Sequence, residues 1–246
     1  MLVHSQGIVL RTVDYQNSSI IATVLSKEKG KIALLAKGAK KPKNKLTGKL
    51  SVGNMIDFVC YFKDSRSVQL VKEADYAEKN FKISSDLHKT AIATMTIEQV
   101  NQLVQDGEEN AMIYSFLETF LIWLNETHAD PTQIFAYNQV RLAHIMGVGL
   151  TLEDALKKPS QHSKSYLNVK DGTITNEAQS DVSLKLTPKQ TLYLKLALLT
   201  KSNKILSLDL PRHEYKLLIR HLDSYFNYHF HEIKPRKSDF IFDQLM

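Results

Sequence analysis

Lysine side chains between residues 27 and 49 are the group in this sequence with the clearest chemical potential. The segment holds nine lysines and one acidic residue, Glu28, whereas the whole chain has 32 Lys and Arg against 26 Asp and Glu. Glycine, proline and asparagine interrupt the last five lysines, which predicts a loop. Such a loop can follow a phosphate backbone, and each contact releases a counterion, so affinity falls as salt rises. These five are Lys40, Lys41, Lys43, Lys45 and Lys49.

A plainer explanation is that the lysines form a solvated loop that only keeps the protein in solution. The run is of one sign, is bounded by Gly38 and Gly48, and follows a predicted strand. Because strand-rich barrels with such loops often bind nucleic acids, we favour an interface with a polyanion.

The sequence contains none of the residue spacings that mark common catalytic or metal-binding sites. The sequence has no His-Glu-x-x-His, no Gly-x-x-x-x-Gly-Lys-Ser/Thr and no Gly-x-Ser-x-Gly. His221, His229 and His231 come closest to a metal site, but the last two are two residues apart and point to different sides of a helix. The paired acids 108–109 and 153–154 are adjacent, so their carboxylates diverge. We therefore predict no catalytic centre, no cofactor and no metal.

The N-terminal part of the chain must position the lysines, and its apolar residues have the pattern of strands with turn residues between them. Five short strands in about seventy residues predict an OB-type barrel, a fold that often binds single strands. The aromatic residues Tyr15, Phe58, Tyr61 and Phe62 could stack on bases or fill the barrel interior. The expected strands include residues 8–10, 20–25, 32–36, 55–62 and 68–71.

The rest of the chain reads as mainly helical, because after Asp86 apolar residues recur every three or four positions. A tight hairpin at residues 166–175 interrupts the helices in an insertion at about 147–183. The predicted fold is thus α+β: an OB-fold domain over 1–80 that binds nucleic acid, then a helical domain over 81–246. Expected helices cover about 87–104, 113–124, 131–146, 188–199 and 211–229, with Pro131, Pro188 and Pro211 in first turns and Asp130 and Thr187 as N-caps.

Three stretches of the sequence carry a family resemblance. They are Gly7-Ile8-Val9-Leu10-Arg11, the run from Gly30 to Lys41 and Leu46-Thr47-Gly48. Together they resemble the N-terminal barrel of the RecO family of bacterial recombination mediators. Later segments agree with this along nearly the whole chain, namely 141–149 and the tail motif Pro235-Arg236-Lys237-Ser238.

The resemblance implies a non-enzymatic mediator of DNA repair in the RecF pathway. Such a protein binds single- and double-stranded DNA, anneals complementary strands, and works with RecR to load RecA onto DNA covered by single-stranded-DNA-binding protein. It implies a cytoplasmic, nucleoid-associated protein that meets RecA indirectly. The expected DNA-binding residues are Arg11, Lys37, Lys40, Lys41, Lys43, Lys45 and Lys49.

The family's helical domain holds the acidic, apolar C-terminal tail of the single-stranded-DNA-binding protein. Arg141 and Arg220, each beside apolar helix positions, are the candidates for its carboxylates. Either could instead be an ordinary surface arginine.

The sequence departs from the family pattern at two places. Many relatives carry four cysteines as a zinc module in the insertion, whereas 147–183 contains none, so a zinc thiolate site cannot form there. Asn17 stands before Ser18, where the family often has an acid, and an amide keeps a capping role but not the charge. This chain is therefore expected to be a zinc-less member.

Two other classes of function stay open: an RNA-binding OB-fold protein, or a non-catalytic interaction scaffold. A membrane protein is not expected, because no run of about 18 apolar residues occurs. The single cysteine, Cys60, lies in an apolar run that suggests a buried strand in a reducing compartment.

Overall fold

The computed structural model of the chain describes residues 1–42, 44–46, 48–78, 81–157, 164–199, 203–230 and 233–245. The chain forms two compact units. Unit 1 consists of residues 1–127 and 236–238, and unit 2 of residues 128–235 and 239–246. Among the described residues, no helix combines the length and the apolar character needed to cross a bilayer.

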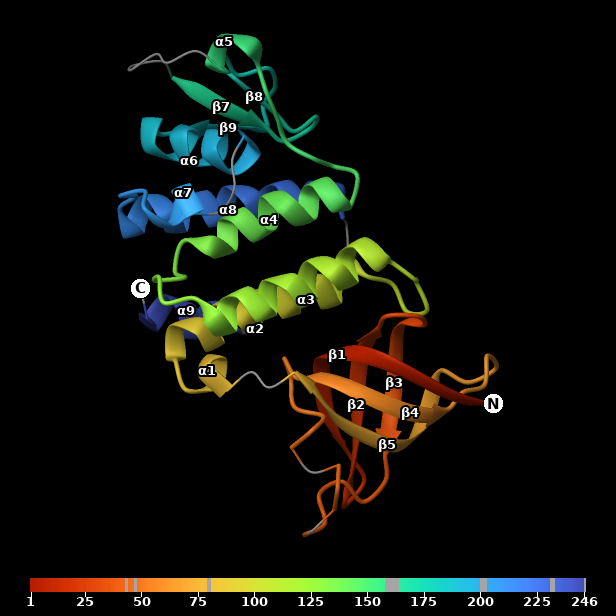
Figure 1. Cartoon of the computed structure of the whole chain (residues 1–246). Helices are drawn as coiled ribbons and strands as arrows, with labels where there is room; N and C mark the ends of the chain where they lie inside the picture. Colours follow the sequence, from red (N-terminus) through yellow and green to blue (C-terminus); the bar gives the residue numbers. More distant parts are fainter. Residues whose placement is uncertain are drawn as a thin grey trace. The chain divides into compact units, whose positions relative to one another are not determined.

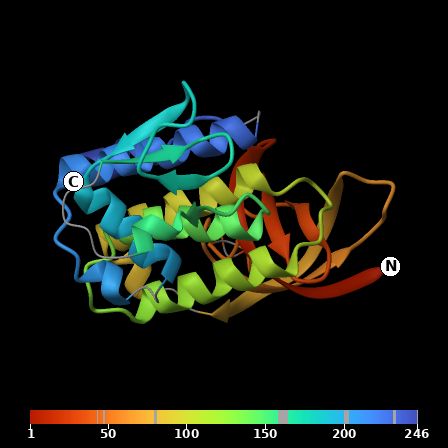
Figure 2. The ribbon, with the colours of Figure 1, turned by 90° about the horizontal axis from the view of Figure 1, so that it is seen from above.

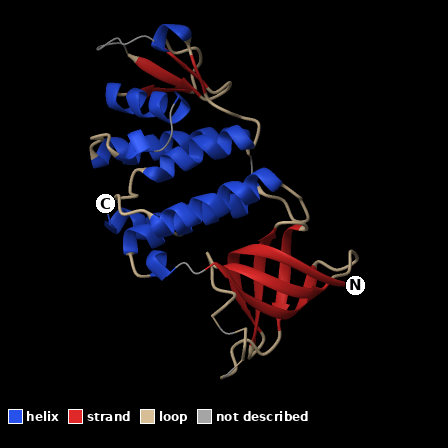
Figure 3. Ribbon diagram, viewed as in Figure 1, coloured by secondary structure: helices blue, strands red, loops and turns tan. Residues whose placement is uncertain are grey.

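Unit 1 begins with a closed barrel of five strands in the order β1-β2-β3-β5-β4 (Figures 1 and 3). Strands β3 and β5 are parallel, and the other neighbours are antiparallel. This is the strand order of an OB-type barrel, so the predicted fold is confirmed. The strands are β1 (Leu2–Tyr15), β2 (Ser19–Ser26), β3 (Gly30–Ala36), β4 (Met55–Tyr61) and β5 (Val68–Glu78).

Strands β1 and β5 are longer than the sequence pattern predicts. In β1, residues 2–8 pair with β4 and residues 7–15 pair with β2, so one strand closes the barrel on both sides. Strand β5 likewise pairs with β3 and β4. Polar residues occupy outward positions of these strands, such as Arg11 and Asp14 of β1, and interrupt the apolar runs. Strand bounds taken from apolar runs alone are therefore too short.

The barrel interior is filled by aliphatic side chains around Phe58, which is 2% exposed. Cys60 is buried there, and burial raises the pKa of its thiol. Gly7 allows the strands to approach one another, since a Cβ built on it would lie 2.4 Å from Val24 Cγ1. Other buried members are Val9, Ala22, Val24, Leu34, Ala36 and Ile56.

Three helices complete unit 1: α1 (Phe81–Ser84), α2 (Leu87–Leu103) and α3 (Ala111–Glu126). Asp86 caps α2 by accepting a hydrogen bond from Lys89 N. The ammonium of Lys89, buried beneath the helices, donates to Asn125 O (3.3 Å) and Thr127 O (2.6 Å). It thereby satisfies carbonyl groups at the end of α3 that have no partner within that helix. The tail residue Ser238 joins unit 1 by donating from N and Oγ to Glu98 Oε2.

Unit 2 combines helices with a four-stranded sheet in the order β6-β8-β7-β9. Figures 1 and 2 show this sheet on one side of the layer formed by α4, α6 and α8. Its strands are β6 (Thr151–Leu152), β7 (Ser165–Asn168), β8 (Thr173–Thr175) and β9 (Ser183–Leu186). Its helices are α4 (Ile134–Ile145), α5 (Asp154–Lys157), α6 (Pro188–Leu199), α7 (Asn203–Leu206), α8 (Arg212–His229) and α9 (Asp239–Leu245).

The predicted hairpin is present as the antiparallel pair β7 and β8, but the insertion holds more than a hairpin. β6 and β9 extend it on both sides. Tyr225 of α8 reaches the hairpin region, where its hydroxyl donates to Val148 O (2.7 Å) and burial raises its pKa to about 12. The turn passes so close that a Cβ on Gly172 would lie 2.5 Å from Tyr225 Oη.

Two of the predicted helix starts are wrong by one to three residues. The helix α4 begins at Ile134 behind Gln133, whose side chain makes no capping bond. Asp130 instead closes the preceding turn by accepting a hydrogen bond from Thr132 N (2.9 Å). Pro131 therefore lies in this turn, and Pro211 is the N-cap residue of α8 rather than part of its first turn.

The predicted cap at Thr187 is confirmed. Gln190 N donates to Thr187 Oγ1 (3.2 Å), and Thr187 N donates to Gln190 Oε1 (2.9 Å). This reciprocal pair is a capping box, and Pro188 is the first residue of α6, where its missing N–H costs nothing.

Candidate nucleic-acid interface

The lysine loop, residues 37–54, joins β3 to β4 at one end of the barrel. Lys40 N donates to Ser18 O (2.9 Å) of the β1–β2 turn, so both connections lie at that end. Between the lysines, Ala39, Leu46 and Leu50 are buried in the barrel core. The buried apolar residues fix the loop to the barrel, while Lys37, Lys40, Lys41 and Lys45 are exposed and Lys49 is half-buried.

The loop lysines fall into two classes. Lys40 Nζ lies 2.7 Å from Asp14 Oδ2, and Lys49 Nζ lies 2.5 Å from Asp75 Oδ1. Lys37, Lys41 and Lys45 are exposed and form no ion pair with any described residue. Lys43 lies outside the described residues. The structure therefore brings five of the predicted lysines onto one loop, of which three form no ion pair within the described part of the chain.

Arg11 lies on β1 rather than on the loop, and its side chain is exposed opposite Thr23 of β2. The same strand is tied to the loop by the hydrogen bond from Thr12 Oγ1 to Leu50 O (2.8 Å) and by the Asp14–Lys40 pair. Arg11 therefore belongs to the strand that supports the loop.

A second cationic group, which the sequence analysis missed, lies at the opposite end of the barrel. Lys29, Lys31 and Arg66 line a cavity of about 400 Å³ together with Phe62. Lys29 Nζ lies 5.3 Å from the centroid of the Phe62 ring. Acids also line it, and Lys31 pairs with Asp106 at 3.2 Å. The β4–β5 loop of OB folds commonly contacts ligands, which is the signal that could have singled out Arg66.

Aromatic side chains do not form a platform on the outer face of β2 and β3, because neither strand contains one. Of the four candidates, Phe58 fills the interior and Phe62 is partly buried against it. Tyr15 and Tyr61 are exposed. Contacts with phosphates, rather than stacking on this face, are therefore what the barrel surface offers most clearly.

Arg141 and Arg220 lie in unit 2 with exposed side chains, on the contacting helices α4 and α8. Leu217, 40% exposed, precedes Arg220 by one helical turn. A guanidinium beside exposed apolar surface suits an acidic, apolar peptide, and this assignment stays a prediction.

No group of three His, Cys, Asp or Glu side chains that could hold a metal occurs among the described residues. His229 Nε2 lies 3.0 Å from Val169 O, and its ring centroid is 4.4 Å from that of Tyr225. His221 is half-buried, and its Nδ1 has no hydrogen-bond partner in the described part of the chain. His231 lies outside the described residues.

Burial lowers the pKa of His221, which makes unit 2 sensitive to acid. Because the unfolded chain binds this proton more readily, the stabilisation is complete above the unfolded pKa of about 6.5 and declines as the pH falls through it. We expect the thermal midpoint to fall between pH 7.5 and 5.5, and to fall less in His221→Gln. The exposed His213→Gln is the control; equal pH dependence in all three proteins would contradict the assignment.

Fold and site together define a protein class: an OB-type barrel with a cationic loop, followed by helices and a small sheet. Residues 1–79 match the family described as Recombination protein O N terminal, and residues 84–239 match Recombination protein O C terminal. The chain belongs to the RecO family, as its sequence resemblance predicted. Membership supports a role in DNA repair.

Several relatives carry the name DNA repair protein RecO. That of Chloroherpeton thalassium is 26% identical over 258 residues, covering 100% of both chains. That of Exiguobacterium sp. is 30% identical over 172 residues, covering 70% of this chain and 68% of the relative. That of Pelodictyon phaeoclathratiforme is 31% identical over 147 residues, covering 60% of this chain and 56% of the relative.

Proposed function

We propose that this protein is a DNA-binding recombination mediator. It anneals complementary strands and helps to load RecA onto single-stranded DNA covered by single-stranded-DNA-binding protein. The observation that carries the proposal is the lysine loop, where Lys37, Lys41 and Lys45 are exposed and form no ion pair with any described residue. Family membership supplies the biological setting.

The loop can promote annealing without making or breaking a covalent bond. Two complementary strands repel each other, and a cationic loop that touches both lowers this repulsion while it releases counterions. Both side chains of the Lys40–Asp14 pair are exposed, and exposed ion pairs contribute little stability. Lys40 can therefore exchange the Asp14 carboxylate for a phosphate at low cost. Lys49 is held more firmly, because its ammonium also donates to Ala74 O (2.9 Å).

Unit 2 is proposed to hold the protein partners. Arg141 and Arg220 would bind the carboxylates of the single-stranded-DNA-binding protein tail, with RecR and, indirectly, RecA as further partners. With DNA as its substrate, the protein would act in the cytoplasm at the nucleoid.

The salt dependence of DNA binding tests the role of the lysine loop. Each single-strand phosphate contact contributes about 0.7 to the slope of log K against log salt. Replacing Lys37, Lys41 and Lys45 by Gln should therefore reduce that slope by about 2. Fluorescence anisotropy of a labelled single strand at several salt concentrations measures it.

The matched control removes the same charge from unit 2 by replacing Lys170, Lys185 and Lys204, which are exposed, with Gln. Its slope should equal that of the unmodified protein. Equal slopes in both triple variants would place the interface elsewhere. Equal affinity for RNA without annealing of DNA would favour the RNA-binding alternative.

A further inference from the structure

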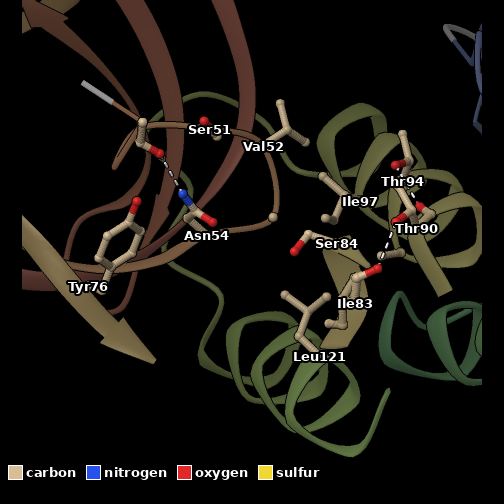
Figure 4. A pocket seen from close by; sticks show the side chains of 13 residues that line it. Ser51, Val52, Asn54, Tyr76, Ile83, Ser84, Thr90, Thr94, Ile97 and Leu121 are labelled. Carbon is tan, nitrogen blue, oxygen red and sulfur yellow. Dashed lines mark hydrogen bonds between the residues drawn. The ribbon is translucent and has the colours of Figure 1, made fainter. Parts of the chain in front are cut away.

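A cavity of about 340 Å³ lies beside the lysine loop within unit 1 (Figure 4). Residues of the loop and of β5 form one side, and residues of α1, α2 and α3 form the other. Figure 4 shows Ser51, Asn54 and Tyr76 on the barrel side and Ile83, Thr90 and Ile97 on the helical side.

The lining selects a ligand that is neutral and partly apolar. Ile83, Ile97 and Leu121 are buried beneath the cavity and provide an apolar floor. Hydroxyl groups of serine, threonine and tyrosine surround this floor. None of the described lining residues carries a charge, so a phosphate group would be poorly compensated inside the cavity. A planar heterocycle with donors and acceptors at its edge fits this combination.

Several polar groups of the lining can bond to such an edge. Thr90 Oγ1 donates to Ile83 O (2.7 Å) and Thr94 Oγ1 donates to Thr90 O (2.8 Å), which leaves both oxygens able to accept. The hydroxyls of Ser51 and Tyr76 have no hydrogen-bond partner among the described residues. Each can either donate or accept.

The cavity is continuous with the predicted phosphate contacts. Its wall includes Gly48 and Ser51, which lie on either side of Lys49 in the chain, and Asn54 Nδ2 fixes this wall by donating to Gly48 O (2.9 Å) and Lys49 O (3.0 Å). A Cβ built on Gly48 would lie 3.6 Å from Tyr76 Oη, so the tyrosine borders the loop directly. Its side chain is 42% exposed, which leaves ring surface available for stacking.

We propose that the cavity receives an unstacked base of a single strand whose phosphates lie on the lysine loop, with Tyr76 stacking on that base. The proposal rests on the proposed DNA binding and adds to it a reason to prefer single strands, since a paired base cannot enter. In this proposal the aromatic contact is made by Tyr76 of β5, because β2 and β3 contain no aromatic residue.

The test compares two single strands of equal length, one ordinary and one in which the central nucleotides are abasic. The phosphate charge is the same in both, so only base contacts differ. We expect the unmodified protein to bind the abasic strand about tenfold more weakly, as the loss of one stacked base implies. In Tyr76→Leu, the two strands should bind within about twofold of each other, near the affinity of the abasic strand.

Tyr61→Leu is the matched control, because Tyr61 is 43% exposed on the neighbouring strand β4 and does not line the cavity. This variant should retain the tenfold difference. Thr94→Phe, which adds a ring to the cavity from α2 and changes no residue of the barrel, gives a second route to the same loss. It keeps the test valid if Tyr76→Leu does not fold.

The outcomes separate this proposal from the one on which it rests. Equal binding of both strands by the unmodified protein, with the lysine-dependent salt slope intact, overturns the base site and leaves DNA binding standing. A tenfold difference that persists in both Tyr76→Leu and Thr94→Phe overturns the assignment to this cavity. No binding of either strand overturns DNA binding itself and the base site with it.

Discussion

Replacing Lys37, Lys41 and Lys45 together by Gln is expected to raise the protein concentration needed for half-maximal strand annealing about 100-fold in roughly 0.1 M salt. A slope of about 0.7 per contact corresponds to roughly a fivefold loss of affinity for each lysine at that salt, and three contacts multiply. Mixing two complementary labelled oligonucleotides and following their fluorescence energy transfer measures the effect.

The unit 2 variant with Lys170, Lys185 and Lys204 replaced by Gln is the control for net charge, and it should anneal strands like the unmodified protein. Higher salt should slow strand annealing by the unmodified protein, and it should slow annealing by the lysine-loop variant much less. If both triple variants annealed strands equally well, the lysine loop would have no special role, and the interaction-scaffold alternative would gain.

Replacing Gly30 by Ala is expected to destabilise unit 1 by about 2–4 kcal/mol, the largest effect we expect from a single substitution. Gly30 begins β3 with a φ of 61°, and a Cβ there would lie 2.1 Å from Glu108 O. The start of β3 and the segment around residue 108 cross here, and they are held together because Gly107 N donates to Lys31 O (2.8 Å). The backbone of both segments must therefore move to admit a methyl group. Urea unfolding followed by circular dichroism measures the loss.

Gly147→Ala separates the cost of the left-handed backbone conformation from the cost of the steric clash. Gly147 has a φ of 79°, but a Cβ built on it would have no atom of the described residues within 4 Å, so only the left-handed conformation is penalised. We expect a loss of about 1 kcal/mol there. Comparable losses at the two glycines would mean that residue 108 can move aside freely and that the crossing is not tight.

The barrel and most helices could be predicted because their signals are local. Alternating apolar residues and turn residues mark β2, β3 and β4, and the capping box at Thr187 marks the start of α6. The start of α4 was misplaced because Asp130 and Pro131 suit a turn as well as a helix start. Local sequence does not distinguish these two uses.

Long-range features were out of reach. β6 has only two residues, and its pairing with β8 depends on the fold around it, so the four-stranded sheet was read as a hairpin. The lysine loop was predicted because its charge is continuous in sequence. The cavity beside it was not, because Ser51, Tyr76 and Thr90 meet only when the barrel packs on α2.

Lysine footprinting of the full chain, with and without a saturating single strand, tests most directly whether the lysine loop binds DNA. An amine-reactive reagent labels exposed lysines, and mass spectrometry reports each position. We expect DNA to protect Lys37, Lys41 and Lys45, while Lys170, Lys185 and Lys204 react as before. Protection confined to the lysines of unit 2, with the loop lysines unchanged, would contradict this expectation.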